Sequence, residues 1–226
     1  MTSAADSERD RAAAKLAAVV PVKTLAETKS RLSPYLGRGG VERLTVAMLS
    51  DVLEALLGAQ GLDRVAVVTP DTNVARAARD AGAEALLRED PSLNAAIDAA
   101  AGELSPGNDD ALLVVLGDVA GIETSDIDTL LDSAPAIGVA LAPSSDGGTA
   151  ALLRSPAGVI GSAFGANSAK RHRERAEAAG VPFLEVRLDS LSLDLDELED
   201  LDRFLARQGG GPRTRELLRE LRSERT

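Results

Sequence analysis

An uninterrupted apolar run that ends in Gly117 and Asp118 restricts the possible fold of this chain more than any other feature. The run begins at Ala111 and reads Ala-Leu-Leu-Val-Val-Leu. A strand of this kind is buried on both faces, as in a parallel sheet, and its carboxyl end lies at the edge where open α/β sheets bind ligands. Asp118 is therefore placed to hold a divalent cation against a phosphate, beside a glycine that permits close backbone approach. The alternative is that Asp118 only caps a turn or the next helix.

Short apolar runs alternate with helical patterns along most of the chain. Asp71 or Thr72 is suited to begin one of the helices, and Ser92 is suited to begin the next. The alternation predicts βαβ units, and hence an α/β fold with a mostly parallel central sheet flanked by helices. The predicted strands are 16–22, 64–68, 84–87, 111–118, 137–142, 150–153 and 183–188, and the predicted helices are 41–57, 73–81, 93–104, 125–132, one ending at 179, 197–207 and 214–222.

The length of 226 residues favours a single domain. Residues 1–15 have no hydrophobic face and are predicted to form a disordered lead-in. We expect the domain to occupy residues 16–207. Residues 208–226 contain three consecutive glycines and then a helical pattern, so they are predicted to form a flexible break followed by a helix that packs loosely or serves as a tail.

The composition excludes several kinds of site and partner. Aromatic residues make up only 2 % of the chain, so the core must be aliphatic, and the lack of cysteine excludes disulfides and cysteine nucleophiles. A net charge of −11 disfavours binding to nucleic acid or an anionic membrane surface. No segment approaches the ~20 apolar residues of a membrane span, and no secretion signal begins the chain. We therefore expect a cytoplasmic protein whose phosphorylated substrates require local cations or metal ions.

Three carboxylates are candidate metal ligands. Mg²⁺ prefers hard oxygen ligands, usually one or two carboxylates together with substrate phosphates and water. Asp194 and Asp196 alternate with leucines, so in an extended segment both face the same way, and Asp118 could join them at the edge of the sheet. The alternative reading is a helix N-terminus whose acidic residues complement the helix dipole.

Three cations follow the first predicted strand, at the same edge of the sheet as Asp118. Lys23, Lys29 and Arg31 could offset the charge of a triphosphate and stabilise a pyrophosphate leaving group. The glycine pattern of a P-loop is absent from the chain. An ordinary solvated loop is the alternative reading.

A glycine-rich segment, Asp146-Gly-Gly-Thr149, together with Gly165, Asn167 and Ser168, could bind an anion through backbone N–H groups and hydroxyls. The same segment is also a good hairpin turn. His172, the only histidine, lies in a basic helical run. We interpret it as a surface or phosphate-adjacent residue rather than a general base.

Taken together, these motifs resemble the 2-phospho-L-lactate/phosphoenolpyruvate guanylyltransferases, which join GTP to a phosphorylated three-carbon acid in the biosynthesis of the deazaflavin coenzyme F-420. The resemblance covers residues 16–205. The sequence differs from the family at two places. Val-Ala follows Asp118 where the family has Leu-Pro, and Glu-Leu follows Asp196 where the family has Thr-Pro. The motifs that carry it, in order, are Pro21-Val-Lys23, Lys29-Ser-Arg31-Leu, Leu93-Asn94, Gly117-Asp118, Asp146-Gly-Gly-Thr149, Phe164-Gly165 to Ser168, His172 and Leu193-Asp-Leu-Asp196.

The resemblance implies a single-domain, Rossmann-like nucleotidyltransferase fold of the sugar-nucleotide transferase type and a set of site residues. Mg²⁺ would be held by Asp118, Asp194 and Asp196, of which Asp118 is also catalytic together with Lys23. The phosphorylated acid would be bound by Thr149, Gly165 and Ser168, and the nucleotide by Lys23, Lys29, Arg31 and Asn94.

The predicted reaction is attack of the substrate phosphate on the α-phosphorus of GTP with release of pyrophosphate, phosphoenolpyruvate being favoured over 2-phospho-L-lactate and 3-phosphoglycerate. A phosphate monoester is already anionic, so positioning and charge neutralisation suffice without a general base. A sugar-nucleotide nucleotidyltransferase, a D-x-D glycosyltransferase and a non-catalytic nucleotide-binding module remain alternatives. A homodimer is possible.

Overall fold

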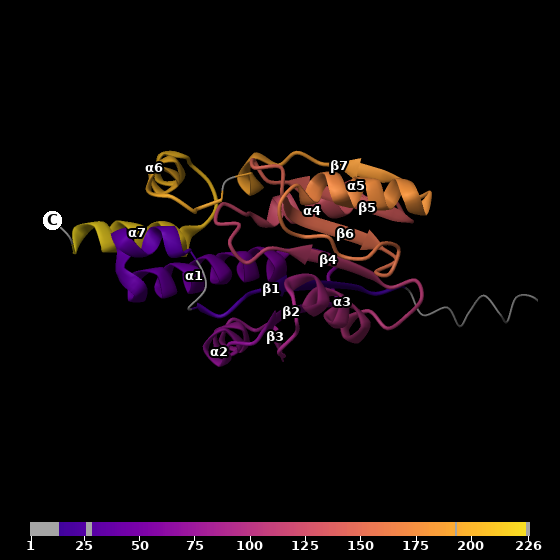
Figure 1. Ribbon diagram of the computed structural model, residues 1–226, viewed down its shortest axis with the longest axis horizontal. Helices are drawn as coiled ribbons and strands as arrows, with labels where there is room; N and C mark the ends of the chain where they lie inside the picture. Colours follow the sequence, from indigo (N-terminus) through magenta and orange to yellow (C-terminus); the bar gives the residue numbers. More distant parts are fainter. Residues whose placement is uncertain (1–13, 26–28, 193, 225–226) are drawn as a thin grey trace, which may run out of the picture.

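The structure is a computed structural model and describes residues 14–25, 29–192 and 194–224. Residues 1–13 of the predicted lead-in lie outside these ranges, as does Leu193 of the acidic motif. Figure 1 shows a central sheet with helices on both faces and a pair of helices, α6 and α7, beyond one end of it.

The sheet has seven strands in the order β3-β2-β1-β4-β6-β5-β7. Four of the six strand pairings are parallel, which confirms the predicted mostly parallel sheet. The exception is β6, which runs antiparallel to both neighbours because only five residues separate it from β5, too few for a parallel crossover. The strands are β1 (Leu16–Pro21), β2 (Arg64–Thr69), β3 (Glu84–Leu87), β4 (Ala111–Val115), β5 (Gly138–Pro143), β6 (Thr149–Ser155) and β7 (Phe183–Glu185).

Both faces of the sheet are covered, so its central strands are mostly apolar. In β1, Ala18 and Val20 pack on one face against helices α1, α2 and α4, whereas Ala17 and Val19 pack on the other against α3. The helices are α1 (Ser33–Gly58), α2 (Thr72–Asp80), α3 (Leu93–Leu104), α4 (Thr124–Ser133), α5 (Ser168–Ala179), α6 (Leu198–Ala206) and α7 (Pro212–Ser223), with 3-10 turns η2 (Ser30–Leu32) and η3 (Asp189–Leu191). None of the helices in the described ranges is both long and apolar enough to cross a membrane.

The predicted helix starts are confirmed where a side chain caps them. The Asp71 carboxylate accepts hydrogen bonds from the first turn of α2, and the Ser92 hydroxyl does the same for α3. The first long helix was predicted to begin at residue 41 but begins at Ser33, with Pro34 in its first turn and a break at Gly37, whose φ is +69°. The strand predicted over 111–118 is also shorter, because β4 ends at Val115.

The C-terminal helix is not loose, contrary to the sequence-based expectation. Thr214, at the start of α7, donates its hydroxyl hydrogen to Asp51 of α1 at 2.7 Å, and its backbone N–H donates to the same carboxylate. Leu218 of α7 is buried against α1, and Arg215 donates to backbone carbonyls before and within the Gly209–Gly211 turn. This helix therefore closes a third apolar cluster together with α6 and the first half of α1.

Candidate active site

Two adjoining cavities occupy the carboxyl edge of the sheet. One, of 510 Å³, lies beyond β1, β2 and β3, and the other, of 240 Å³, lies between β1 and Asp118. They share Pro21, Val22, Lys23 and Leu93 as lining residues, so together they form one cleft along this edge. The position agrees with the ligand-binding edge that the apolar run of β4 predicts.

Asp118 follows β4 and contacts a lysine across the cleft. Lys29 Nζ lies 3.0 Å from Asp118 Oδ2 and 3.0 Å from Asp196 Oδ1, and the lysine side chain is only 5 % exposed. Burial lowers the pKa of Lys29, but the two carboxylates outweigh it and raise the pKa above its usual value. Lys29 thus joins acids 89 and 167 residues away in the sequence and, in this structure, neutralises carboxylates rather than phosphates.

Asp194 completes an acidic cluster with Asp118 and Asp196. Burial first, and then the charges of Asp118, Asp146 and Asp196, raise its pKa to about 7, while Lys29 opposes the shift. The helix-cap alternative does not describe this residue, because Glu197 and Asp200 form the capping box of α6. The cluster therefore holds more negative charge than its one buried lysine offsets.

The acidic cluster has the donor chemistry that a hard divalent cation requires, namely carboxylate oxygens with uncompensated charge. Within the described ranges, no group of three or more acidic or histidine side chains is already arranged around a metal position. Lys29 Nζ lies between two of the three acids. Magnesium binding by Asp118, Asp194 and Asp196 thus fits the donor set and stays a prediction.

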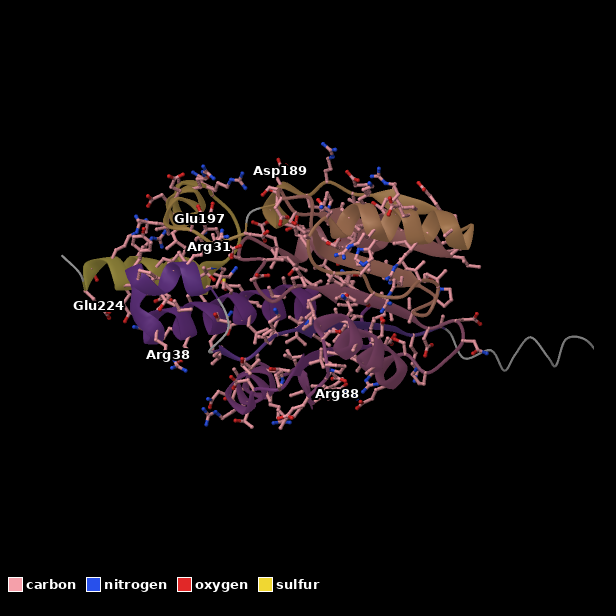
Figure 2. All side chains as sticks on the ribbon, in the orientation of Figure 1. Arg31, Arg38, Arg88, Asp189, Glu197 and Glu224 are labelled. Carbon is pink, nitrogen blue, oxygen red and sulfur yellow. The ribbon has the colours of Figure 1, made fainter. Side chains whose placement is uncertain are left out.

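The other predicted nucleotide ligands fall in different environments. Lys23 is exposed and lines both cavities, as a phosphate-binding cation would. Figure 2 shows Arg31 of η2 beside Glu197, the residue that precedes α6, and the two form an exposed ion pair of 3.0 Å. Asn94 at the start of α3 uses its amide on the backbone of Phe164, accepting at 2.7 Å and donating at 3.2 Å. It therefore ties α3 to the loop before α5.

The glycine-rich segment forms the hairpin between β5 and β6, as its alternative reading predicted. Asp146 accepts hydrogen bonds from the Ser144 hydroxyl and the Gly148 N–H, and these bonds lower the pKa of Asp146. Gly147 and Gly165 have φ values of +82° and +118°, which favour glycine. The hairpin also contacts α5, because Ala169 N–H donates to the Gly147 carbonyl.

Thr149 and Ser168, predicted to bind the phosphorylated acid, lie side by side beneath this hairpin. Ser168 Oγ is 2.9 Å from Thr149 Oγ1, and Thr149 Oγ1 is 3.1 Å from His172 Nδ1. His172 is fully buried, so its assignment to the surface is wrong. Burial, followed by the charges of nearby arginines including Arg154, lowers the pKa of His172 to about 4, and the ring is neutral near pH 7.

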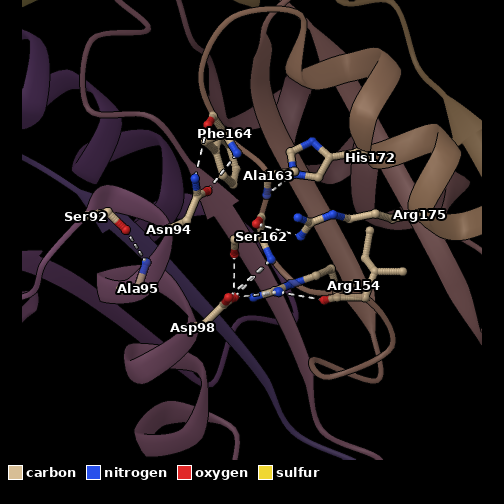
Figure 3. A network of polar contacts seen from close by, with 11 residues as sticks. Ser92, Asn94, Ala95, Asp98, Arg154, Ser162, Ala163, Phe164, His172 and Arg175 are labelled. Atoms are coloured by element: carbon tan, nitrogen blue, oxygen red, sulfur yellow. Dashed lines mark hydrogen bonds and ion pairs between the residues drawn. The ribbon is translucent and has the colours of Figure 1, made fainter.

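A buried network around Arg154 escaped the sequence analysis (Figure 3). Arg154 Nη1 donates to Asp98 at 3.1 Å and to the Ile160 carbonyl at 2.9 Å, and Asp98 also accepts from the backbone and hydroxyl of Ser162. The side chain of Arg154 is 1 % exposed, and burial lowers its pKa. A single charge inside the otherwise apolar strand β6 was the available signal. The network fixes the segment that leads to Gly165.

Comparison with known proteins finds relatives that are named guanylyltransferases. It is 38 % identical to a phosphoenolpyruvate guanylyltransferase of Sphaerobacter thermophilus, over 83 % of this chain and 91 % of the relative. It is 34 % identical to a 2-phospho-L-lactate guanylyltransferase of Methanothermobacter thermautotrophicus, over 92 % of each chain. A 3-phospho-D-glycerate guanylyltransferase of Phenylobacterium zucineum is 38 % identical, over 91 % of this chain and 96 % of that one.

The fold has a solved counterpart as well. A protein of Desulfovibrio desulfuricans G20, assigned as a nucleotide-diphospho-sugar transferase, superposes with a TM-score of 0.75 at 16 % identity, over 93 % of this chain and 96 % of that one. This likeness supports the predicted sugar-nucleotide transferase type of fold. Residues 16–225 match the family model described as guanylyl transferase, CofC like. The chain therefore belongs to the CofC-like guanylyl transferase family.

Proposed function

We propose that this protein transfers GMP from GTP to a phosphorylated three-carbon acid and releases pyrophosphate. The observation that carries the proposal is the acidic cluster of Asp118, Asp194 and Asp196 beside the cleft at the carboxyl edge of the sheet. A cleft of two cavities can take a nucleotide along β1 to β3 and leave the acidic cluster at the reacting phosphates. The family membership supports the choice of guanylyl transfer.

Phosphoenolpyruvate is the favoured acceptor because several relatives carry that name, the Sphaerobacter protein among them. Relatives named for 2-phospho-L-lactate and 3-phospho-D-glycerate are similarly close. Phosphoenolpyruvate and 2-phospho-L-lactate differ by a double bond, and 3-phosphoglycerate differs from both in a hydroxyl and in the carbon that carries the phosphate. Identity over the whole chain does not resolve such differences. We propose that the product serves the biosynthesis of coenzyme F-420, as the CofC-like family suggests.

In the proposed reaction, an oxygen of the acceptor phosphate forms a bond to the α-phosphorus of GTP, while the bond from that phosphorus to the bridging oxygen of the β-phosphate breaks. Pyrophosphate leaves with that bonding pair. The exposed ammonium of Lys23 would bind the triphosphate, and no side chain needs to remove a proton because the attacking phosphate is anionic. When bound at the acidic cluster, Mg²⁺ would neutralise the charge of the two phosphates.

The buried histidine supports a mechanism without a general base. One nitrogen of the His172 ring accepts a hydrogen bond from the Ala163 N–H at 2.9 Å, and the other contacts Thr149. With a pKa of about 4 and both nitrogens engaged, the ring is a poor proton acceptor near neutral pH.

A panel that measures pyrophosphate release tests the proposal. GTP and ATP are each combined with phosphoenolpyruvate, 2-phospho-L-lactate, 3-phosphoglycerate and a sugar 1-phosphate, in the presence of Mg²⁺. We expect release with GTP and at least one of the acids. Release with the sugar phosphate alone would make the protein a sugar-nucleotide nucleotidyltransferase, and GTP binding without release for any acceptor would make it a non-catalytic module.

A further inference from the structure

Three polar side chains form a hydrogen-bonded chain that is almost completely buried. Thr149 is 2 % exposed, Ser168 1 % and His172 0 %. They come from the start of β6 and the first two turns of α5. The start of β6 lies beside the residues that lead to Asp118, because Leu116 N–H donates to the Ala150 carbonyl at 3.0 Å. The hairpin before Thr149 also contacts the segment that leads to Asp194, because Ser145 N–H donates to the Ser192 carbonyl at 3.1 Å. The hydroxyl pair is therefore near the proposed reaction centre.

The tautomer of the His172 ring is fixed by the backbone of Ala163. A backbone N–H can only donate, and that of Ala163 lies 2.9 Å from Nε2, so Nε2 is unprotonated and accepts. A neutral ring must then carry its hydrogen on Nδ1. It follows that Nδ1–H donates to Thr149 Oγ1 and that Thr149 accepts this bond.

We propose that His172 is a positioning residue that leaves the Thr149–Ser168 hydroxyl pair with one hydrogen to donate to the carboxylate of the acceptor. The two hydroxyls have two hydrogens between them, and their mutual contact of 2.9 Å uses one. Since His172 already donates to Thr149, the second hydrogen is not needed by the ring. Whichever hydroxyl carries it, no described residue accepts it.

The opposite tautomer would remove this hydrogen. If Nδ1 were the acceptor, Thr149 would donate to the ring, Ser168 would donate to Thr149, and the pair would have only lone pairs to offer. Such a pair would repel a carboxylate. A buried hydroxyl that must donate instead selects an acceptor oxygen, and an anionic oxygen most strongly. The site is thereby matched to a phosphate ester that also carries a carboxylate.

The surrounding structure holds the Ala163 N–H in place. Asn94 binds the backbone of Phe164 on one side of it, and Asp98 binds the backbone of Ser162 on the other (Figure 3). The ring of Phe164 also meets that of His172 edge to face, with centroids 5.0 Å apart. These contacts keep the His172 ring from rotating by 180°. The fold therefore fixes Nε2 as the hydrogen-bond acceptor and Nδ1–H as the donor.

Two substitutions separate the roles of the two ring nitrogens. The amide of Asn places an N–H where Nδ1 stands and cannot reach Ala163, so His172→Asn keeps the donor to Thr149. The longer amide of Gln reaches the Nε2 position, so His172→Gln keeps the contact with Ala163 and loses the donor. Steady-state kinetics with phosphoenolpyruvate and GTP are measured for both variants, with thermal melting to confirm that each is folded.

We expect His172→Gln to raise the KM for phosphoenolpyruvate about tenfold or more, while the KM for GTP stays within about twofold. Without the Nδ1–H donor, the Thr149 hydroxyl is no longer held with its lone pair toward residue 172, so the free hydrogen is not directed at the carboxylate and a hydrogen bond to a charged group is lost. His172→Asn should keep both constants near those of the parent. An unchanged KM for phosphoenolpyruvate in folded His172→Gln would overturn the inference. So would equal losses in both variants, or a rise in both KM values together, which indicate a merely structural residue.

The inference rests on the proposed function, and the two can fail separately. If the parent protein releases no pyrophosphate with any phosphorylated acid, the proposed function fails. The proposed donation of a hydrogen by the Thr149–Ser168 pair is then tested by calorimetric titration of phosphoenolpyruvate into the parent and the two variants. Weaker binding by His172→Gln alone supports the inference, and equal binding by all three overturns it.

Discussion

At the scale of single residues, the candidate site depends on an acid that follows β4 and on a buried lysine that pairs with it. Asp118 could be chosen because an acid directly follows a fully apolar strand. The pairing of Lys29 with Asp118 and Asp196 could not, because it joins loops that only the folded sheet brings together. The φ of Lys29 is +49°, in a region that few residues other than glycine favour, and no pattern in the local sequence predicts it. His172 was misplaced because its neighbours in sequence are charged while its own side chain turns inward.

Replacing Asp118 with Asn should reduce turnover by roughly 100-fold or more, the scale expected when one electrostatic stabiliser of a transition state is lost. Pyrophosphate release at saturating GTP and Mg²⁺ measures the effect. Asp109→Asn, an exposed acid at the opposite edge of the sheet, is the matched control and should retain parental turnover. Parental turnover in folded Asp118→Asn would remove this residue from the site.

Magnesium should stabilise the parent protein even without substrates. At ten times its dissociation constant, an ion that binds only the folded state adds about 1.4 kcal/mol, which corresponds to a rise of roughly 3–6 °C in Tm for a chain of this size. Thermal melting with Mg²⁺ and again after chelation measures it. Asp196→Asn should lose most of the rise and Asp109→Asn none. An equal rise in Asp196→Asn would contradict the assignment of Asp196 as a ligand.

At the scale of elements, periodicity located nearly every strand and helix but not their final arrangement. The apolar pattern of β6 resembles that of a parallel strand, and its antiparallel direction follows from the short hairpin before it. Likewise, the glycines before α7 suggested a loose tail. The helix is fixed instead by long-range partners, Asp51 and the apolar residues of α1, which a reading of the local sequence does not detect.

The packing of α7 predicts a clear effect on stability. Leu218→Ala should lower the free energy of unfolding by about 2–5 kcal/mol, because it leaves a cavity between α7 and α1. Urea denaturation measures the change. Glu216→Ala, an exposed position on the same helix, should shift stability by about 0.5 kcal/mol or less. Equal stability of the two variants would mean that α7 does not pack as described.

At the scale of the whole molecule, the buried His172 and the half-buried Asp194 give opposite dependences of stability on pH. The His172 ring has a pKa of about 4 in the folded state and about 6.5 when unfolded, so its contribution is complete above pH 6.5 and is lost as the pH falls toward 4. Asp194, with a pKa of about 7 instead of 3.8, disfavours folding at high pH and less so as the pH falls. The pH dependence of the parent's free energy of unfolding therefore combines the contributions of His172 and Asp194.

Comparison with His172→Leu isolates the histidine term. The variant lacks the titrating ring but keeps Asp194, so the difference in unfolding free energy between parent and variant should fall by about 3 kcal/mol between pH 7 and pH 4. Urea denaturation at several pH values gives this difference. A difference that does not change with pH would mean that the ring titrates normally in the folded protein.

That this chain contains one histidine has a practical consequence for spectroscopy. Labelling with ¹⁵N-histidine yields signals from one imidazole, and the chemical shifts of its two nitrogens differ strongly between the tautomers. Addition of a phosphorylated acid can be followed through the same two signals. The ring thus serves as a built-in reporter on the Thr149–Ser168 hydroxyl pair in solution, without any foreign probe or substitution.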